Sequence, residues 1–150
     1  MLIRALILVG VLSLTACGGS TTSATTTSAP TIANLAANFA TVGCIRSSDG
    51  LAGRALAITF DFSDPMGDTT GGRIQLTRVY DTGRSETHFF VVPTEVKVSG
   101  TGTSGQILIG NACPLYNDAT KSTERLTLID SGGATSNSLS VSVTRPAGAP

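Results

Sequence analysis

Three carboxylates lie close together in the chain, at Asp61, Asp64 and Asp68. Between them, Pro65 presets one backbone angle of a turn and Gly67 permits unusual ones. Calcium takes several oxygen ligands at flexible geometry, so the three aspartates are a candidate calcium site. Their spacing is not that of an EF-hand loop. The alternative is that Asp64 and Asp68 cap a tight turn while Asp61 faces solvent.

His88 is the single histidine and the one side chain that could serve as a base in a Ser-His-Asp site. It lies within a stretch expected to be a strand, and the chain has no Gly-x-Ser-x-Gly elbow. We therefore expect a protein that is not an enzyme, with His88 on the wet face of its strand. The competing hypothesis is an enzyme that uses His88.

Gly100, Gly102 and Gly105 match the letters of a dinucleotide-binding motif. That motif works only where a helix begins at the loop and offers its N-terminus to the pyrophosphate. Here a strand-like Gln106-Ile107 sequence follows, so we expect a flexible turn and no nucleotide. No other pattern implies a cofactor, apart from the possible calcium.

The charge balance gives no support for two kinds of interaction. The chain has 10 basic and 10 acidic residues and a formal net charge of +0. Scattered charges with no net excess give no electrostatic reason to expect nucleic acid or a polybasic membrane surface.

These residues must be positioned by strands, because apolar and polar side chains alternate with period two through most of the chain. One apolar face and one polar face suit a half-buried antiparallel strand. Residues 31–41 could form a first strand or a short helical turn, and we favour an edge strand. Seven or eight such strands with turns between them predict a β-sandwich. The alternating segments are 56–62, 73–77, 96–98, 107–109, 125–128 and 139–144.

Two segments add a family resemblance. Phe60 to Asp68 resembles the second strand and loop of bacterial immunoglobulin-like domains, and Leu126 to Asn137 resembles their last hairpin. The resemblance implies a single immunoglobulin-like or fibronectin-like antiparallel β-sandwich of about seven strands over residues 32–145, with a flexible tail at 146–150. The chain has no tryptophan, and Tyr116 follows Cys113, so no antibody-type core or tyrosine corner is indicated.

The start of the chain reads as an export signal. Arg4 precedes an apolar run over residues 5–14, which is shorter than the roughly 20 residues of a membrane-spanning helix. The run ends in Leu14-Thr15-Ala16-Cys17, which resembles the lipobox of bacterial lipoproteins. The resemblance implies removal of residues 1–16, palmitate-type acylation of Cys17 and anchoring to a membrane. The alternative is an ordinary secretory signal with a coincidental cysteine.

A flexible tether is expected after the anchor. Residues 17–31 combine the acylated Cys17 with a Gly/Ser/Thr-rich spacer that cannot bury enough surface to fold. Gly18, rather than aspartate, follows the cysteine, which by analogy with the family favours the outer membrane if the host has one. The expected localisation is therefore the bacterial cell envelope.

With Cys17 acylated, Cys44 and Cys113 are the remaining cysteines. Export places them where a disulfide persists, and closing a loop of about 70 residues would stabilise the fold by roughly 4 kcal/mol. Two buried free thiols are the alternative. Together these features predict a membrane-anchored, non-catalytic lipoprotein that presents its domain to an unidentified envelope protein or ligand. A purely structural envelope spacer is the other hypothesis.

Overall fold

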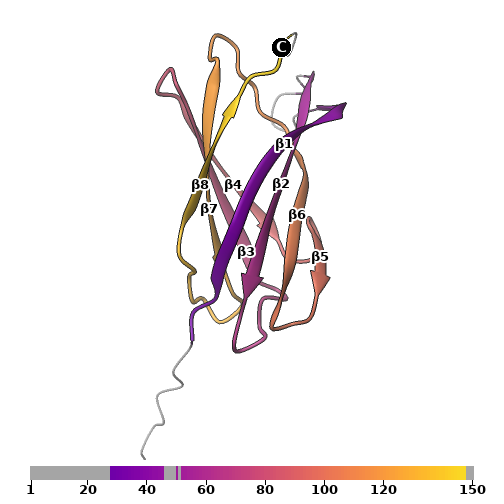
Figure 1. Cartoon of the computed structure of the whole chain (residues 1–150), viewed down its shortest axis with the longest axis vertical. Helices are drawn as coiled ribbons and strands as arrows, with labels where there is room; N and C mark the ends of the chain where they lie inside the picture. The colour runs from indigo at the N-terminus through magenta and orange to yellow at the C-terminus, as the bar shows by residue number, and fades with distance from the viewer. Residues whose placement is uncertain (1–27, 46–49, 51, 148–150) are drawn as a thin grey trace, which may run out of the picture.

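The computed structural model describes residues 28–45, 50 and 52–147, which build two antiparallel sheets packed face to face (Figure 1). One sheet has the strand order β1-β2-β6-β5 and the other β4-β3-β7-β8. The all-β sandwich expected from the sequence is confirmed, with eight strands in the described part of the chain. They are β1 (Thr31–Ile45), β2 (Ala52–Ser63), β3 (Arg73–Tyr80), β4 (Ser85–Val91), β5 (Lys97–Gly100), β6 (Ser104–Ala112), β7 (Lys121–Ile129) and β8 (Leu139–Thr144).

The distribution of the strands is that of an immunoglobulin-like sandwich. The first, second, fifth and sixth strands share one sheet, and the third, seventh and eighth share the other. β4 extends the second sheet at its edge, where it pairs with β3 alone. The two sheets pack face to face because the period-two alternation of the sequence gives each of them one apolar face to bury against the other.

The core lies between the sheets. Along β3, the fully buried Ile74 and Leu76 alternate with the more exposed Arg73, Gln75 and Thr77. β2, β6 and β7 bury apolar residues in the same way, and the buried residues of the two sheets interdigitate. The edge strands β4 and β5 differ, because Phe89, Val91 and Val98 are exposed. The other main members of this core cluster are Ile32, Leu56, Ile58, Phe60, Phe62, Val92, Val96, Ile107, Ile109, Ala112, Leu126, Leu128 and Val143.

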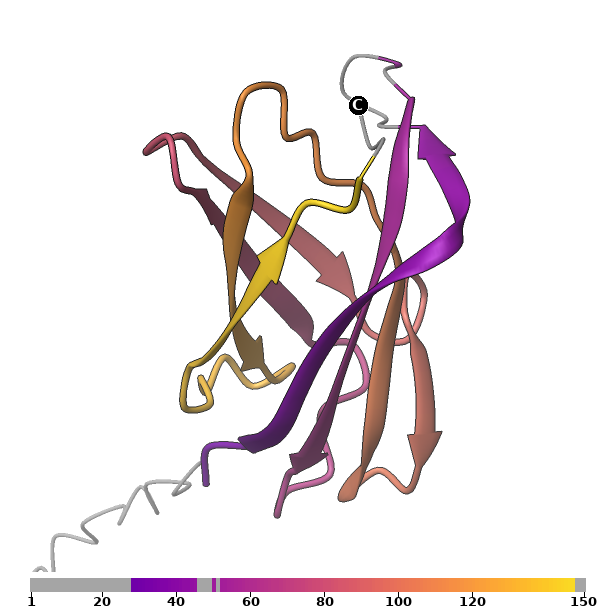
Figure 2. The ribbon, with the colours of Figure 1, turned by 45° about the horizontal axis from the view of Figure 1, so that its top comes forward.

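The ambiguous segment 31–41 is part of β1. This strand pairs with β2 alone, so it is the edge strand that the sequence favoured. Its register with β2 shifts between Ala33 and Ala36 and again between Phe39 and Gly43, and Asn34 has a positive φ of 54°. β1 crosses the front of the molecule from one end to the other (Figure 2).

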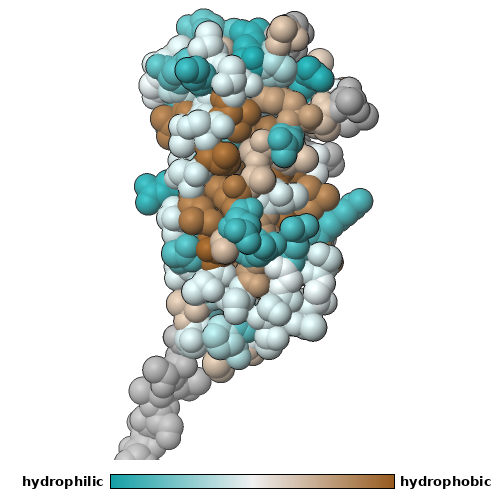
Figure 3. All heavy atoms as spheres, in the orientation of Figure 1, coloured by the Kyte–Doolittle hydropathy of each residue, from teal (hydrophilic) through white to brown (hydrophobic). Residues whose placement is uncertain are grey.

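Two ends of the sandwich are distinct. At the N-terminal end, where β1 begins, lie the loops 64–72, 101–103 and 130–138. Asn137 closes this end by accepting from the Ile32 N–H at 2.8 Å and donating to the Ile32 carbonyl at 3.0 Å. The opposite end carries the turn 81–84 and the segment 113–120. On the face that β1 crosses, apolar surface gathers over the middle of the molecule, between these two ends (Figure 3).

The glycine-rich segment forms a turn between β5 and β6, and a strand follows it, as the sequence predicted. Gly100 has a φ of +115°, and a Cβ at Gly105 would lie 2.0 Å from the Ser99 carbonyl oxygen. Both positions therefore require glycine for the close approach of two strands and not for a phosphate.

Candidate functional site

A cluster of three carboxylates lies at the N-terminal end. Asp64 and Asp68 come from the loop between β2 and β3, and Asp130 comes from the loop between β7 and β8. One oxygen of each lies within 4.8 Å of the others. The Ser131 N–H donates to the Asp68 carbonyl at 3.0 Å, which joins the two loops.

Each carboxylate of this cluster has a different environment. Asp64 is fully buried and accepts from the Thr69 hydroxyl at 2.7 Å and from the Met66 N–H at 3.1 Å. Asp130 accepts from the Ala134 N–H at 2.7 Å. The Oδ1 atom of Asp68 is buried without a hydrogen-bond partner among the described residues. Asp68 is thus the member of the cluster with unsatisfied acceptor capacity.

The electrostatics of the cluster follow from these contacts. Burial and the neighbouring charges of Asp130 and Asp64 raise the pKa of Asp68. Burial by itself would raise the pKa of Asp64, but hydrogen bonds, foremost that from Thr69, hold it below its ordinary value. An oxygen-seeking cation or a proton on Asp68 would each relieve the repulsion among the three groups.

The structure separates Asp61 from the other two aspartates of the sequence motif. Asp61 lies on the outer side of β2, where its carboxylate accepts from Asn34 at 2.7 Å and from Gln106 at 3.2 Å. These two hydrogen bonds, that of Asn34 first, lower its pKa. Asp130 takes its place in the cluster. The aspartate before a Ser-Gly-Gly turn was the sequence signal for it, but nothing local connected it to Asp64.

His88 lies in β4, as the sequence indicated, and its side chain is 39% exposed. It shares the inner side of that strand with Glu86 and Phe90, while Phe89 on the outer side is 53% exposed. Its Nε2 lies 3.2 Å from Oε2 of Glu86. Because β4 is an edge strand, the His88 side chain remains partly open to solvent although it lies on the inner side.

A polar network extends from His88 toward the opposite end. The Tyr80 hydroxyl donates to Oε1 of Glu86 at 2.5 Å and accepts from the Leu115 N–H at 3.1 Å. Burial, then the bond to Glu86, raises the pKa of Tyr80 to about 12. Arg84 stacks over the Tyr80 ring at 3.9 Å. Among the described residues, Glu86 therefore links Tyr80, Arg84 and His88 in one network.

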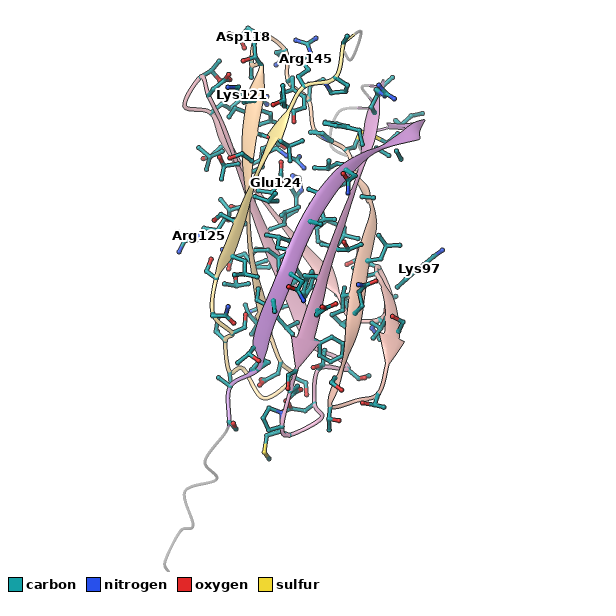
Figure 4. The ribbon with its side chains drawn as sticks, in the orientation of Figure 1. Lys97, Asp118, Lys121, Glu124, Arg125 and Arg145 are labelled. Atoms are coloured by element: carbon teal, nitrogen blue, oxygen red, sulfur yellow. A yellow bond between two sulfur atoms is a disulfide. The ribbon has the colours of Figure 1, made fainter. Side chains whose placement is uncertain are left out.

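The interior also holds a charged pair, formed by Arg78 of β3 and Glu124 of β7. Both side chains lie on the inner faces of their strands, in line with Leu76 and Leu126. Glu124 is labelled in Figure 4. Neither residue of the pair was a candidate from the sequence. The available signal was a charged residue standing in register with the apolar positions of two neighbouring strands.

Cys44 and Cys113 form a disulfide, as predicted. Their Cα atoms are 5.8 Å apart, and the bond joins the last part of β1 to the segment that follows β6. Gly53 of β2 lies beneath it, where a Cβ would approach the Cys113 sulfur at 3.2 Å. The bridge therefore covers the opposite end of the sandwich.

Cys17 and the expected signal and tether before residue 28 lie outside the described residues. Within residues 28–45, 50 and 52–147, no helix is long and apolar enough to cross a membrane. No family model, curated protein or solved structure matches the chain.

Proposed function

We propose that the chain is a lipoprotein of the bacterial envelope, acylated at Cys17, whose sandwich is a non-catalytic binding module. The lipobox-like Leu14 to Cys17 segment and the uncharged spacer after it support the anchor. Two or three acyl chains would hold the protein stably, at roughly 0.8 kcal/mol per buried methylene.

One structural observation carries the binding role. The chain enters the sandwich at the N-terminal end, beside the loops 64–72 and 130–138. An anchor ahead of β1 leaves the opposite end and both outer sheet faces directed toward other molecules. At the opposite end, Asp81 accepts from the Thr120 hydroxyl at 2.6 Å and from the Lys121 N–H at 3.1 Å, which joins the turn 81–84 to the start of β7.

The test is expression from the native signal in a bacterial host, with intact-mass measurement and crosslinking on whole cells. We expect loss of residues 1–16, added acyl mass and a reproducible crosslinked partner. The Cys17→Ser variant is the matched control and should carry no acyl mass. An unacylated wild-type protein would contradict the anchor, and an anchored protein that captures nothing would favour the structural spacer.

A second candidate function is a calcium-dependent module. The observation that favours it is the convergence of Asp64, Asp68 and Asp130, with the buried Oδ1 of Asp68 lacking a partner. Calcium binds oxygen ligands of this kind. We expect millimolar calcium to raise the melting temperature of the wild-type protein and to leave Asp68→Asn unchanged. An equal rise of the melting temperature in Asp61→Asn and in the wild type would agree with the placement of Asp61 outside the site. A wild-type melting temperature that calcium does not change would rule out the calcium site.

A further inference from the structure

The outer face of the β4-β3-β7-β8 sheet is sorted by charge. Both acidic residues of these four strands, Glu86 and Glu124, lie on the inner side. Arg73, Lys121 and Arg125 lie on the outer side and are exposed. The face is therefore cationic on a chain whose formal net charge is +0. Charges that are scattered along the sequence are gathered here by the strand alternation.

Hydroxyl and amide groups fill the space between these cations. The strand register places Gln75 beside Phe89 and Thr127, and Thr77 beside Thr87 and Arg125. A shallow hollow of about 340 Å³ lies on this face. Its lining residues are Gln75, Thr77, Arg125, Thr127 and Thr135.

The two arginines of the central strands are held in place. Arg125 donates from Nε to the Ser138 hydroxyl at 2.8 Å, and its guanidinium carries further N–H donors suited to a carboxylate. Arg73 lies 5.5 Å from the centre of the Phe89 ring. Phe89 is 53% exposed and offers an apolar ring beside the polar hollow.

We propose that this outer face binds an acidic polysaccharide, with Arg125 and Arg73 pairing with its carboxylates. The inference rests on the proposed binding function and names the ligand class. Threonine hydroxyls both donate and accept, which matches the hydroxyls of a sugar. Phe89 supplies a ring on which one sugar face can pack.

Two other macromolecules fit this surface less well. The core of a protein interface is enriched in aromatic residues, and Phe89 is the single aromatic on the outer side of these strands. Nucleic-acid affinity depends on many phosphate contacts, and three cations spread over a flat sheet supply few. A polymer that carries both hydroxyls and carboxylates complements the hydroxyls and cations of this face better.

The test measures binding of the full-length acylated protein, in detergent micelles, to polygalacturonate and to neutral dextran. We expect polygalacturonate to bind, dextran not to bind, and Arg125→Gln to weaken binding about tenfold. Lys97→Gln is the matched control, because Lys97 is exposed and points outward on the opposite side of the molecule from Arg125 (Figure 4). Thr77→Val removes a hydroxyl from the hollow without changing charge and should weaken binding severalfold.

The outcomes separate the ligand from the binding function. Equal losses in Arg125→Gln and Lys97→Gln, or equally tight binding of DNA, would show general charge attraction and overturn the proposal. An envelope protein crosslinked elsewhere on the domain, with no binding of polygalacturonate, would overturn the ligand and keep the binding function. If the acylated wild-type protein binds no polygalacturonate and crosslinks to no envelope protein, both the proposed ligand and the proposed binding function are wrong.

Discussion

Arg78 of β3 and Glu124 of β7 face each other inside the sandwich, with Nε of the guanidinium 2.7 Å from Oε1 of the carboxylate. The Ser122 hydroxyl donates to the same Oε1 at 2.8 Å. Burial would lower the pKa of Arg78, but Glu124 holds it above its ordinary value. Arg78 Nη2 and Glu124 Oε2 lack hydrogen-bond partners in the part of the chain that the structure describes. The pair is therefore incompletely satisfied.

Breaking this pair from one side should be costly. We expect Glu124→Gln to lower the free energy of unfolding by about 3 kcal/mol, because it leaves the Arg78 charge buried without its counter-ion. The double variant Arg78→Met/Glu124→Leu should lose less than Glu124→Gln, since no charge remains inside. Urea denaturation measures both, and a double variant that is the less stable of the two would contradict this account.

The disulfide should contribute strongly to stability. Replacing Cys44 and Cys113 by alanine should lower the free energy of unfolding by about 4 kcal/mol, because the unfolded chain gains the freedom of an open loop. Denaturation with and without a reductant checks this value. Reduction should also add the mass of two hydrogen atoms to the wild-type protein. If the reductant changes neither the stability nor the mass, the disulfide is absent.

The two tyrosines of the chain, Tyr80 and Tyr116, should titrate late. Burial raises the pKa of both, that of Tyr80 to about 12. Because the pKa of Tyr80 is higher in the folded than in the unfolded protein, its protonated hydroxyl favours the folded state. This contribution to the free energy of unfolding is complete below the ordinary pKa of 10.0 and is lost as the pH rises through about 12. Tyrosinate absorbance should therefore stay flat through pH 10 and rise together with unfolding. Tyr116→Phe isolates Tyr80, and a step near pH 10 in the folded protein would contradict its burial.

Asp68 and Asp64 should respond to substitution in opposite directions. Asp68→Asn should raise the melting temperature at neutral pH in a chelator, because it removes repulsion from Asp64 and Asp130. Asp64→Ala should lower the free energy of unfolding by about 1–3 kcal/mol, because the donors of Thr69 and Met66 lose their acceptor. Thermal melts at neutral pH compare the two, and equal signs would refute the assignment of roles.

Most of the fold could be predicted from the sequence, because alternation such as that of Leu139 to Val143 specifies a strand and its buried face locally. The candidate site could be predicted only in part, because the sequence indicated Asp64 and Asp68 but not Asp130. Asp130 is brought to Asp64 by the packing of two loops that are far apart in the chain, and no local pattern encodes that contact. The cationic sheet face was missed for a related reason, since net charge does not show which side of a strand Arg73 or Arg125 occupies.

The position of the Cys44–Cys113 bond has a mechanical consequence for a tethered molecule. A pull from the anchor acts along β1 from Thr31, so the hydrogen bonds of the β1–β2 ladder bear the load in shear. If β1 peels away from β2, the release stops at Cys44, where a covalent bond carries the force into the segment after β6. The disulfide then works as a stop that limits how far the domain can extend before its core is disturbed.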